Sequence, residues 1–196
     1  MGFSAGFLVN GFVLVKQTEE KSPRVDEGVR VMNIRKCSQT DFDRIYFIIN
    51  EAARAYESVI PADRYHQPYM PADELKREMK RMTFYGWEEN GELVGVMGQE
   101  PIKDVTLIRH AYVLTDWQRR GIGSKLLSYC QELVTTSRLL VGTWADAQWA
   151  LDFYQKHGFR LMSDKDELLK TYWDIPQRQV ETSVVLGIEV KQKHDG

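Results

Sequence analysis

The stretch YVLTDWQRRGIGSKLL, from Tyr112 to Leu127, decides the fold of this chain. It opens with apolar and β-favouring residues, carries Gly121 and Gly123 at its centre, and closes with apolar residues at helical spacing. This pattern predicts a strand that turns directly into a helix. Glycines let a backbone approach a ligand closely, and the unpaired amides of a helix's first turn attract anions. The stretch is therefore predicted to form an anion-binding turn.

Three basic residues, Arg119, Arg120 and Lys125, add positive charge around this turn. A pyrophosphate is the expected ligand. The glycine spacing matches neither G-x-x-x-x-G-K-[ST], which a Walker loop requires, nor the dinucleotide pattern G-x-G-x-x-G. Nucleotide hydrolysis and NAD binding are therefore disfavoured.

Two blocks of sequence resemble the GNAT acetyltransferase superfamily. The first reproduces its acetyl-CoA motif, including the spacing from a strand valine to the glycines, and consists of Val113, Gln118, Gly121 and Gly123. The second has the form AxxxYxxxGF, resembles the helix and strand that follow the motif in that superfamily, and consists of Ala150, Tyr154, Gly158 and Phe159. The resemblance extends from Met32 to about Val185.

The resemblance implies acetyl-CoA as co-substrate and no metal. The amides from Gln118 to Ser124 are expected to bind the pyrophosphate, and the strand backbone near Tyr112 to pair with pantetheine. One departure is visible, because many members carry Asn where this chain has Ala147. The expected cofactor-binding residues are Tyr112, Val113, Gln118, Arg119, Arg120, Gly121, Ile122, Gly123, Ser124 and Lys125.

Attack of an amine on a thioester needs an unprotonated nucleophile, a donor for the oxyanion and a proton for the leaving thiolate. The resemblance assigns the proton donor to Tyr154, since a phenol with a pKa of about 10 stays protonated at pH 7. Core packing is the alternative for Tyr154. Glu100 and His110 are candidate general bases, with structural roles or water chains as the alternatives. A backbone amide of the strand 112–114 is expected to hold the oxyanion.

The loop ADRYHQPYMP, residues 62–71, is expected to line the acceptor pocket by the same resemblance. Its basic and aromatic residues would suit an acceptor with a carboxylate or a ring. An ordinary surface loop is the alternative. The candidate substrate residues are Arg64, His66 and Tyr69.

The remaining pattern predicts a mixed α/β domain with a GNAT-like acyl-CoA N-acyltransferase fold, whose mostly antiparallel central sheet is flanked by helices. Asn90-Gly91 predicts a hairpin, because both residues tolerate the positive φ of a type I′ turn. Helices are expected to begin at Ser38 or Thr40 and at Pro71, Gly121, Asp146 and Asp164. Strands are expected near Ile34 and over 83–89, 93–99, 105–113, 139–144, 159–162 and 180–190.

With 196 residues, 43% of them apolar, the chain suits one domain with an extension. Residues 1–30 are expected to lie outside the core, 31–190 to form the acetyltransferase domain, and 191–196 to be a flexible tail. The longest apolar window, Phe3–Val15, is shorter than the roughly 20 residues that span a bilayer. No basic residue precedes it, so export is disfavoured and a cytoplasmic location is expected.

The charges and cysteines exclude other classes of protein. The net charge of 26 − 28 = −2 gives no general attraction to nucleic acid or an anionic membrane. Cys37 and Cys130 have no ligand residues nearby, which argues against a disulfide framework or a zinc site. Cys130 falls on an apolar helical stripe, so a ping-pong route through its thiol is disfavoured.

The sequence therefore predicts an N-acetyltransferase that moves an acetyl group from acetyl-CoA directly to an amine on a small molecule or a protein. It does not identify that amine, and it is compatible with a homodimer. The alternative from another class is a catalytically silent acyl-CoA sensor or interaction module.

Overall fold

The computed structural model describes residues 33–63, 65–173 and 175–190. The expected extension 1–30, the expected tail 191–196 and the candidate substrate residue Arg64 lie outside these ranges. None of the described helices is long and apolar enough to span a bilayer.

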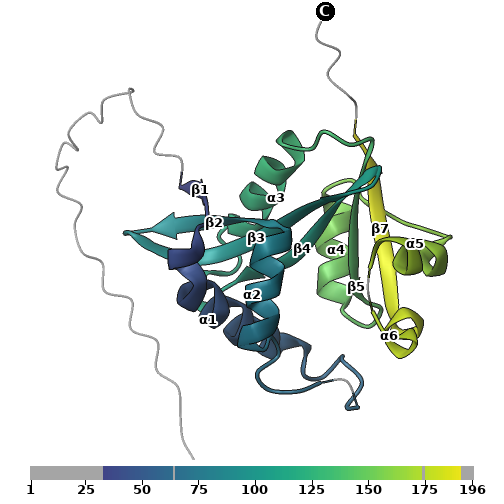
Figure 1. Ribbon diagram of the computed structural model, residues 1–196, viewed down its shortest axis with the longest axis horizontal. Helices are drawn as coiled ribbons and strands as arrows, with labels where there is room; N and C mark the ends of the chain where they lie inside the picture. Colours follow the sequence, from purple (N-terminus) through teal and green to yellow (C-terminus); the bar gives the residue numbers. More distant parts are fainter. Residues whose placement is uncertain (1–32, 64, 174, 191–196) are drawn as a thin grey trace, which may run out of the picture. The chain divides into compact units, whose positions relative to one another are not determined.

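A 7-stranded sheet in the order β1-β2-β3-β4-β5-β7-β6 forms the centre of the described chain (Figure 1). Every neighbouring pair is antiparallel except β4 and β5, which are parallel. The predicted mixed α/β fold with a mostly antiparallel sheet is therefore confirmed. The strands are β1 (Ile34–Lys36), β2 (Thr83–Glu89), β3 (Glu92–Ile102), β4 (Val105–Val113), β5 (Arg138–Trp144), β6 (Arg160–Leu161) and β7 (Ser183–Glu189).

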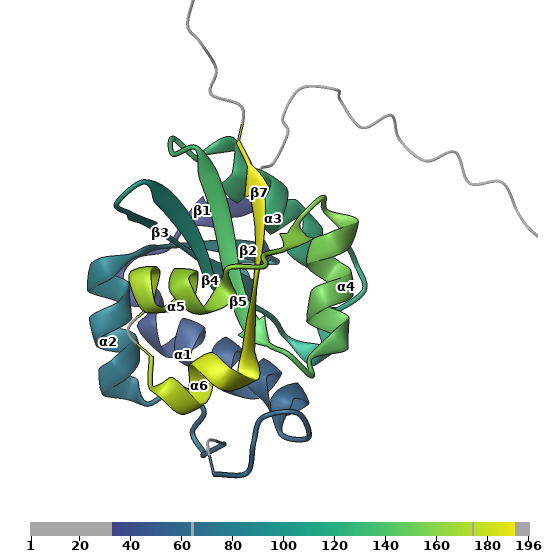
Figure 2. The ribbon, with the colours of Figure 1, turned by 90° about the vertical axis from the view of Figure 1, so that its right-hand side faces the viewer.

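Helices cover both faces of this sheet. Figure 2 shows α1, α2 and α5 on one side of the strands and α3 and α4 on the other. The α-helices are α1 (Phe42–Ala52), α2 (Ala72–Arg81), α3 (Ile122–Glu132), α4 (Gln148–Lys156), α5 (Lys165–Tyr172) and α6 (Gln177–Thr182). Short 3₁₀ turns are η1 (Gln39–Asp41), η2 (Ala53–Tyr56) and η3 (Thr115–Trp117).

Apolar stripes on the helices fill the space on each face. Ile45, Ile48 and Ile49 of α1 are fully buried, as are Leu126 and Cys130 of α3. Their spacing of three and four residues is what places them on one side of each helix. The sheet is therefore covered on both faces, which explains the long buried run of β3.

The predicted hairpin is confirmed at Asn90 and Gly91, whose φ angles of 51° and 82° are those of a type I′ turn between β2 and β3. The predicted strand over 180–190 was wrong at its start, because α6 continues to Thr182. Pro176 precedes that helix with φ near −62°, and Pro is favoured where a helix begins. Val180 is the buried residue of α6, and one buried apolar residue is compatible with the spacing of a helix as well as with the alternation of a strand.

Two expected helices also differ from the structure, α4 in its start and the first helix, which does begin after Ser38, in its continuity. α4 is preceded by Ala147 in the cap position and not by Asp146, and no side-chain bond caps it. The first predicted helix, expected to run from Ser38 or Thr40 to about Ile60, is divided into η1, α1 and η2. Its last part, η2, brings Tyr56 to the end of the sheet where β4 and β5 separate.

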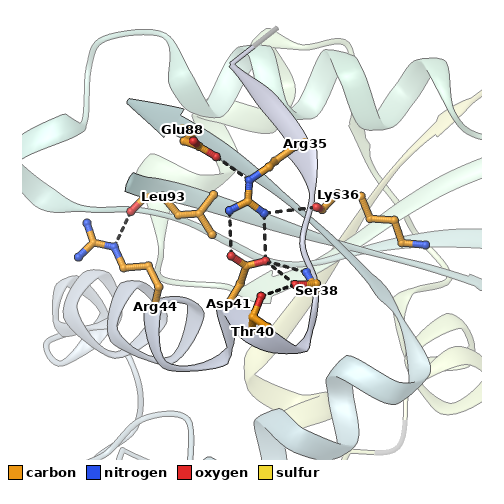
Figure 3. A network of polar contacts seen from close by, with 8 residues as sticks. All are labelled: Arg35, Lys36, Ser38, Thr40, Asp41, Arg44, Glu88 and Leu93. Carbon is orange, nitrogen blue, oxygen red and sulfur yellow. Dashed lines mark hydrogen bonds and ion pairs between the residues drawn. The ribbon is translucent and has the colours of Figure 1, made fainter. Parts of the chain in front are cut away.

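A polar network attaches the edge strand β1 to its neighbours (Figure 3). The Arg35 guanidinium donates to both carboxylate oxygens of Asp41, at 2.8 and 3.0 Å, and Nε donates to Glu88 at 2.5 Å. The Asp41 carboxylate also accepts from the Ser38 amide at 2.7 Å. These bonds to Arg35, together with the Ser38 amide, outweigh burial and lower the pKa of Asp41 to about 2.

The parallel strands β4 and β5 separate before they end. Their register runs from Val105–Arg138 to Ile108–Val141, although β4 continues to Val113 and β5 to Trp144. Beyond Ile108, no described residue pairs with β4 as a strand on its β5 side. The sheet therefore opens into a gap at this end.

A bulge in β4 accompanies the separation. Between the pairs Val96–Tyr112 and Gly98–Arg109, β4 contains one residue more than β3, and His110 adopts a φ of 50°. A bulge of this kind puts two successive side chains on one face of the sheet. Arg109 and His110 accordingly both contact Glu78 of α2.

Candidate active site

The predicted anion-binding turn joins η3 to α3. Two residues in it adopt left-handed conformations, Arg119 with φ of 61° and Gly121 with φ of 79°. The Gln118 side chain holds the turn to the strand by donating from Nε2 to the Val113 carbonyl at 2.9 Å. A non-glycine residue with positive φ is strained, and such strain gathers at ligand sites.

The amides of this turn are free to donate. The first bond of α3 runs from the Lys125 amide to the Gly121 carbonyl, and no side chain caps the helix. Within the described chain, the amides from Arg119 to Ser124 donate to no backbone or side-chain acceptor. A Cβ placed on Gly121 would meet no atom within 4 Å, so its face is open.

A cleft of about 570 Å³ starts at this turn and extends between β4 and α4. Eight expected cofactor-binding residues line it, Tyr112, Val113, Gln118, Arg119, Gly121, Ile122, Gly123 and Ser124. Two do not: the Arg120 guanidinium lies 4.6 Å from the ring centre of Trp117, and the Lys125 ammonium 4.6 Å from that of Trp87. Their cationic groups thus cover indole rings and do not face the cleft.

Tyr154 lies at the inner end of the cleft. Its side chain is 5% exposed, packed edge-on against Phe153 and Phe159. Among the described residues, no donor or acceptor forms a hydrogen bond with its hydroxyl. Burial raises the pKa of Tyr154 far above its usual value, so the phenol is protonated at neutral pH.

A second, smaller cavity of about 120 Å³ continues from the cleft into the gap between β4 and β5. We call it the inner pocket. It shares Tyr56, Ala111, Tyr112 and Tyr154 with the cleft, and these residues form the junction. Its remaining lining residues are Tyr69, Gly142, Thr143, Trp144, Leu169, Trp173, Ile175, Gln179 and Ser183.

Of the expected acceptor residues in the described chain, only Tyr69 lines the inner pocket. His66 is exposed, with Nδ1 2.8 Å from the Pro68 carbonyl oxygen. Tyr56, which is not among the expected site residues, lines both the cleft and the inner pocket. Its ring lies 6.5 Å from that of Tyr69 and 6.3 Å from that of Tyr112, and burial raises its pKa to about 12.

Trp149, which is not among the expected site residues, also lines the cleft. Its side chain is 45% exposed, and its ring centre lies 5.2 Å from that of Tyr56. The signal for this role was its place one position before Ala150 in the AxxxYxxxGF block. Helical spacing puts that position on the neighbouring face of α4, next to the cleft.

Neither candidate base lines the cleft or the inner pocket. Both belong to a charged cluster between α2 and the sheet. Glu100 accepts from Arg81 and Arg109, each at 3.0 Å, and His110 Nε2 lies 3.1 Å from Glu78. Burial raises the pKa of Glu78, but the bond to His110 and the charge of Arg109 outweigh it, so the pKa is lowered.

Two other residues are structural by position. Cys130 is fully buried, and burial raises the pKa of its thiol to about 12, which is the opposite of an activated thiolate. Ala147 is fully buried beside Ile60 and Trp144 and does not line the cleft. The asparagine side chain that the resemblance leads one to expect at this position is therefore missing.

Comparison with known proteins identifies the domain. A family model described as the Acetyltransferase (GNAT) domain matches residues 80–161. The chain carries a GNAT acetyltransferase domain. The matched residues include the anion-binding turn, β4, α3 and Tyr154. The resemblance inferred from the two sequence blocks is thereby confirmed, and with it the enzyme class of acyltransferase.

Solved structures of the same fold cover most of the GNAT domain. The PaiA N-acetyltransferase of Thermoplasma acidophilum, in complex with coenzyme A, is 16% identical with a TM-score of 0.62, over 80% of this chain and 97% of that one. The ribosomal-protein-S18-alanine N-acetyltransferase of Escherichia coli is 15% identical with a TM-score of 0.60, over 83% and 96%. An IAA acetyltransferase of Bacillus cereus is 23% identical with a TM-score of 0.54, over 80% and 97%. No curated protein matches the chain in sequence.

Proposed function

We propose that this GNAT domain transfers an acetyl group from acetyl-CoA directly to an amine. The observation that carries the proposal is the row of free amides from Arg119 to Ser124, at one end of a cleft that reaches Tyr154 at the other. The similar Thermoplasma acidophilum structure, which holds coenzyme A, supports the same ligand here.

The residues of the cleft fit the parts of that ligand. A pyrophosphate suits the free amides and the positive end of α3, and the exposed guanidinium of Arg119 adds a cation. Beyond Ile108, β4 has no neighbouring strand on its β5 side. An extended pantetheine chain would pair with the backbone there, near Tyr112 and Val113, in the manner of an added strand.

The reaction would take place at the junction of the cleft and the inner pocket. The amine nitrogen attacks the thioester carbon, a C–N bond forms and the C–S bond breaks; the amine loses one proton and the thiolate gains one. We assign the second proton to the Tyr154 hydroxyl, which is buried, protonated and without a partner in the described chain. A backbone amide of the bulged part of β4 would stabilise the oxyanion.

The proposal assigns no side chain as general base. Glu100 and His110 are held in the charged cluster and line neither cavity. The lining residues that the structure describes carry no charged side chain, and desolvation in such a pocket lowers the pKa of an entering ammonium because it disfavours the charged form. The amine would therefore lose its proton to water on entry. Glu100 and His110 would instead stabilise the folded protein through their ion pairs in the charged cluster.

Replacement of Tyr154 by Phe tests the assignment. We expect kcat to fall by roughly 10²- to 10⁴-fold, the usual contribution of a general acid. Acetyl-CoA should still raise the melting temperature. Tyr129→Phe is the matched control, because Tyr129 lies on α3 and packs edge-on against Tyr85, away from both cavities. Equal turnover in both variants would exclude Tyr154 as the acid.

A silent acyl-CoA sensor is the second candidate, favoured by the buried Ala147 and by the position of Glu100 and His110 outside the cleft. Thiol release from acetyl-CoA over a broad acceptor library separates the two functions. A sensor would gain about 2.7 kcal/mol of stability at a hundredfold excess over Kd and release no thiol with any acceptor.

A further inference from the structure

The lining of the inner pocket indicates what kind of acceptor fits it. Six of its side chains are aromatic, Tyr56, Tyr69, Tyr112, Trp144, Tyr154 and Trp173. The other described lining residues are small, aliphatic or uncharged polar. No lysine, arginine, histidine, aspartate or glutamate is among those that the structure describes.

We infer that the acceptor is a small arylalkylamine, in which one ring is joined to the amine by a short chain that bears no carboxylate or phosphate. The inference rests on the proposed function, since it requires acetyl-CoA in the adjoining cleft. A cavity of roughly 150 Å³ holds one benzene molecule, so the 120 Å³ here is close to the size of a single ring. The aromatic faces would contact that ring, and the hydroxyl and amide groups of the lining leave the pocket partly polar. The amine would then point to the junction at Tyr154.

The arrangement of three tyrosines favours a ring over an alkyl group. Tyr56 and Tyr69 are stacked at 6.5 Å, and Tyr112 meets them edge-on at 6.3 and 6.4 Å. A bound ring that met one of these tyrosines in a similar geometry would gain about 0.5–1.5 kcal/mol beyond the area that it buries, and an alkyl group would not. By the factor of ten per 1.36 kcal/mol, this corresponds to a preference of about 2- to 12-fold.

The absence of cations among the described lining residues disfavours an acidic acceptor. A carboxylate that enters the inner pocket would lose its water without gaining a counter-ion, which is strongly unfavourable. Arg81 and Arg109 are close to this face of the sheet, but both are paired with Glu78 and Glu100. The amine itself is tolerated, because aromatic faces attract an ammonium until it loses its proton.

Matched acceptors test this inference. 2-Phenylethylamine, phenylalanine and 2-cyclohexylethylamine differ by one carboxylate or by the aromaticity of the ring. We expect kcat/KM for 2-phenylethylamine to exceed that for phenylalanine at least 100-fold and that for 2-cyclohexylethylamine about 2- to 12-fold. A ratio below tenfold against phenylalanine, or a higher kcat/KM for spermidine or for a lysine-containing peptide, would overturn the inference.

A charge introduced into the lining provides a second test. Gln179 of α6 is half-buried and lines the inner pocket, whereas Gln177 of the same helix is exposed and does not. Gln179→Lys should reduce the discrimination against phenylalanine at least tenfold and leave the KM for acetyl-CoA unchanged. Gln177→Lys should change neither. Identical acceptor preferences in the two variants would contradict the assignment of the pocket.

The outcomes for the two proposals are separable. If acetyl-CoA fails to raise the melting temperature, the proposed function is wrong. If acetyl-CoA binds and the acceptor order is reversed, only the acceptor inference is wrong. If acetyl-CoA binds and no acceptor reacts, titration calorimetry of 2-phenylethylamine and phenylalanine into the coenzyme A-saturated protein decides, and equal or absent binding of the two overturns the inference.

Discussion

Glu100→Gln distinguishes a structural carboxylate from a catalytic one. The Glu100 side chain is 7% exposed and forms ion pairs of 3.0 Å with Arg81 and with Arg109. Apart from His110, the charged cluster contains the carboxylates of Glu78 and Glu100 and the guanidiniums of Arg81 and Arg109, whose charges balance. The substitution leaves Glu78 to neutralise both guanidiniums, and the buried cluster carries a net positive charge.

Loss of one partner from a buried ion pair costs about 3–5 kcal/mol. Gln has the shape of Glu and still accepts a hydrogen bond, so we expect the lower end, about 3 kcal/mol, or a fall in melting temperature of roughly 6–12 °C for a domain of this size. Turnover of the folded variant, measured well below its melting temperature, should stay within about threefold of the original, because Glu100 lines neither cavity.

Glu92→Gln is the control for this experiment. Glu92 lies on the same strand, β3, and its pair with Arg44 at 3.2 Å leaves its side chain 73% exposed. Exposed pairs contribute about 0–1 kcal/mol, so its loss should barely change the urea midpoint. If Glu100→Gln kept full stability and lost two or more orders of magnitude in kcat, Glu100 would be the general base and its structural assignment would be wrong.

Two further substitutions address the anion-binding turn and the network of Figure 3. In Gly121→Ala the added Cβ meets no other atom, but it stands on a residue with left-handed φ. Alanine should therefore destabilise the observed conformation of the turn by about 1–2 kcal/mol. The KM for acetyl-CoA, measured by thiol release, should rise several-fold. Asp41 has a folded pKa of about 2 against 3.8 for the unfolded chain, so its contribution is present above about pH 4 and is lost as the pH falls toward 2. Asp41→Asn should therefore lower the urea-unfolding free energy by about 1–2 kcal/mol at pH 7 and leave it unchanged at pH 2. Equal losses at both pH values would show that Asp41 acts through something other than its charge.

The sequence predicted those turns whose conformation depends on residues that are adjacent in the chain. Asn90-Gly91 specifies its own turn, because the φ angles it needs are those that these residues tolerate. The turn before α3 was predicted for a similar reason, since Gly121 adopts a positive φ that glycine tolerates, and the amides after it are unpaired. In both cases the turn requires a positive φ, and the residue at that position is of a type that tolerates it.

The features missed depend on pairing between distant residues. The bulge at His110 arises from the register of β4 against β3, which no single stretch of sequence displays. It turns His110 toward Glu78, and that contact explains why a candidate base lies in the charged cluster. Likewise, Tyr56 reads as one more apolar helix position until η2 brings it beside Tyr112.

The separation of β4 from β5 has a kinetic meaning. Residues of α3 and α4 line the cleft, and residues of α5 and α6 line the inner pocket, so in the proposed reaction the two reactants would occupy different cavities that share Tyr56, Ala111, Tyr112 and Tyr154. Both could then be bound at the same time. Such a layout favours a ternary complex, in which the acetyl group passes directly from one reactant to the other.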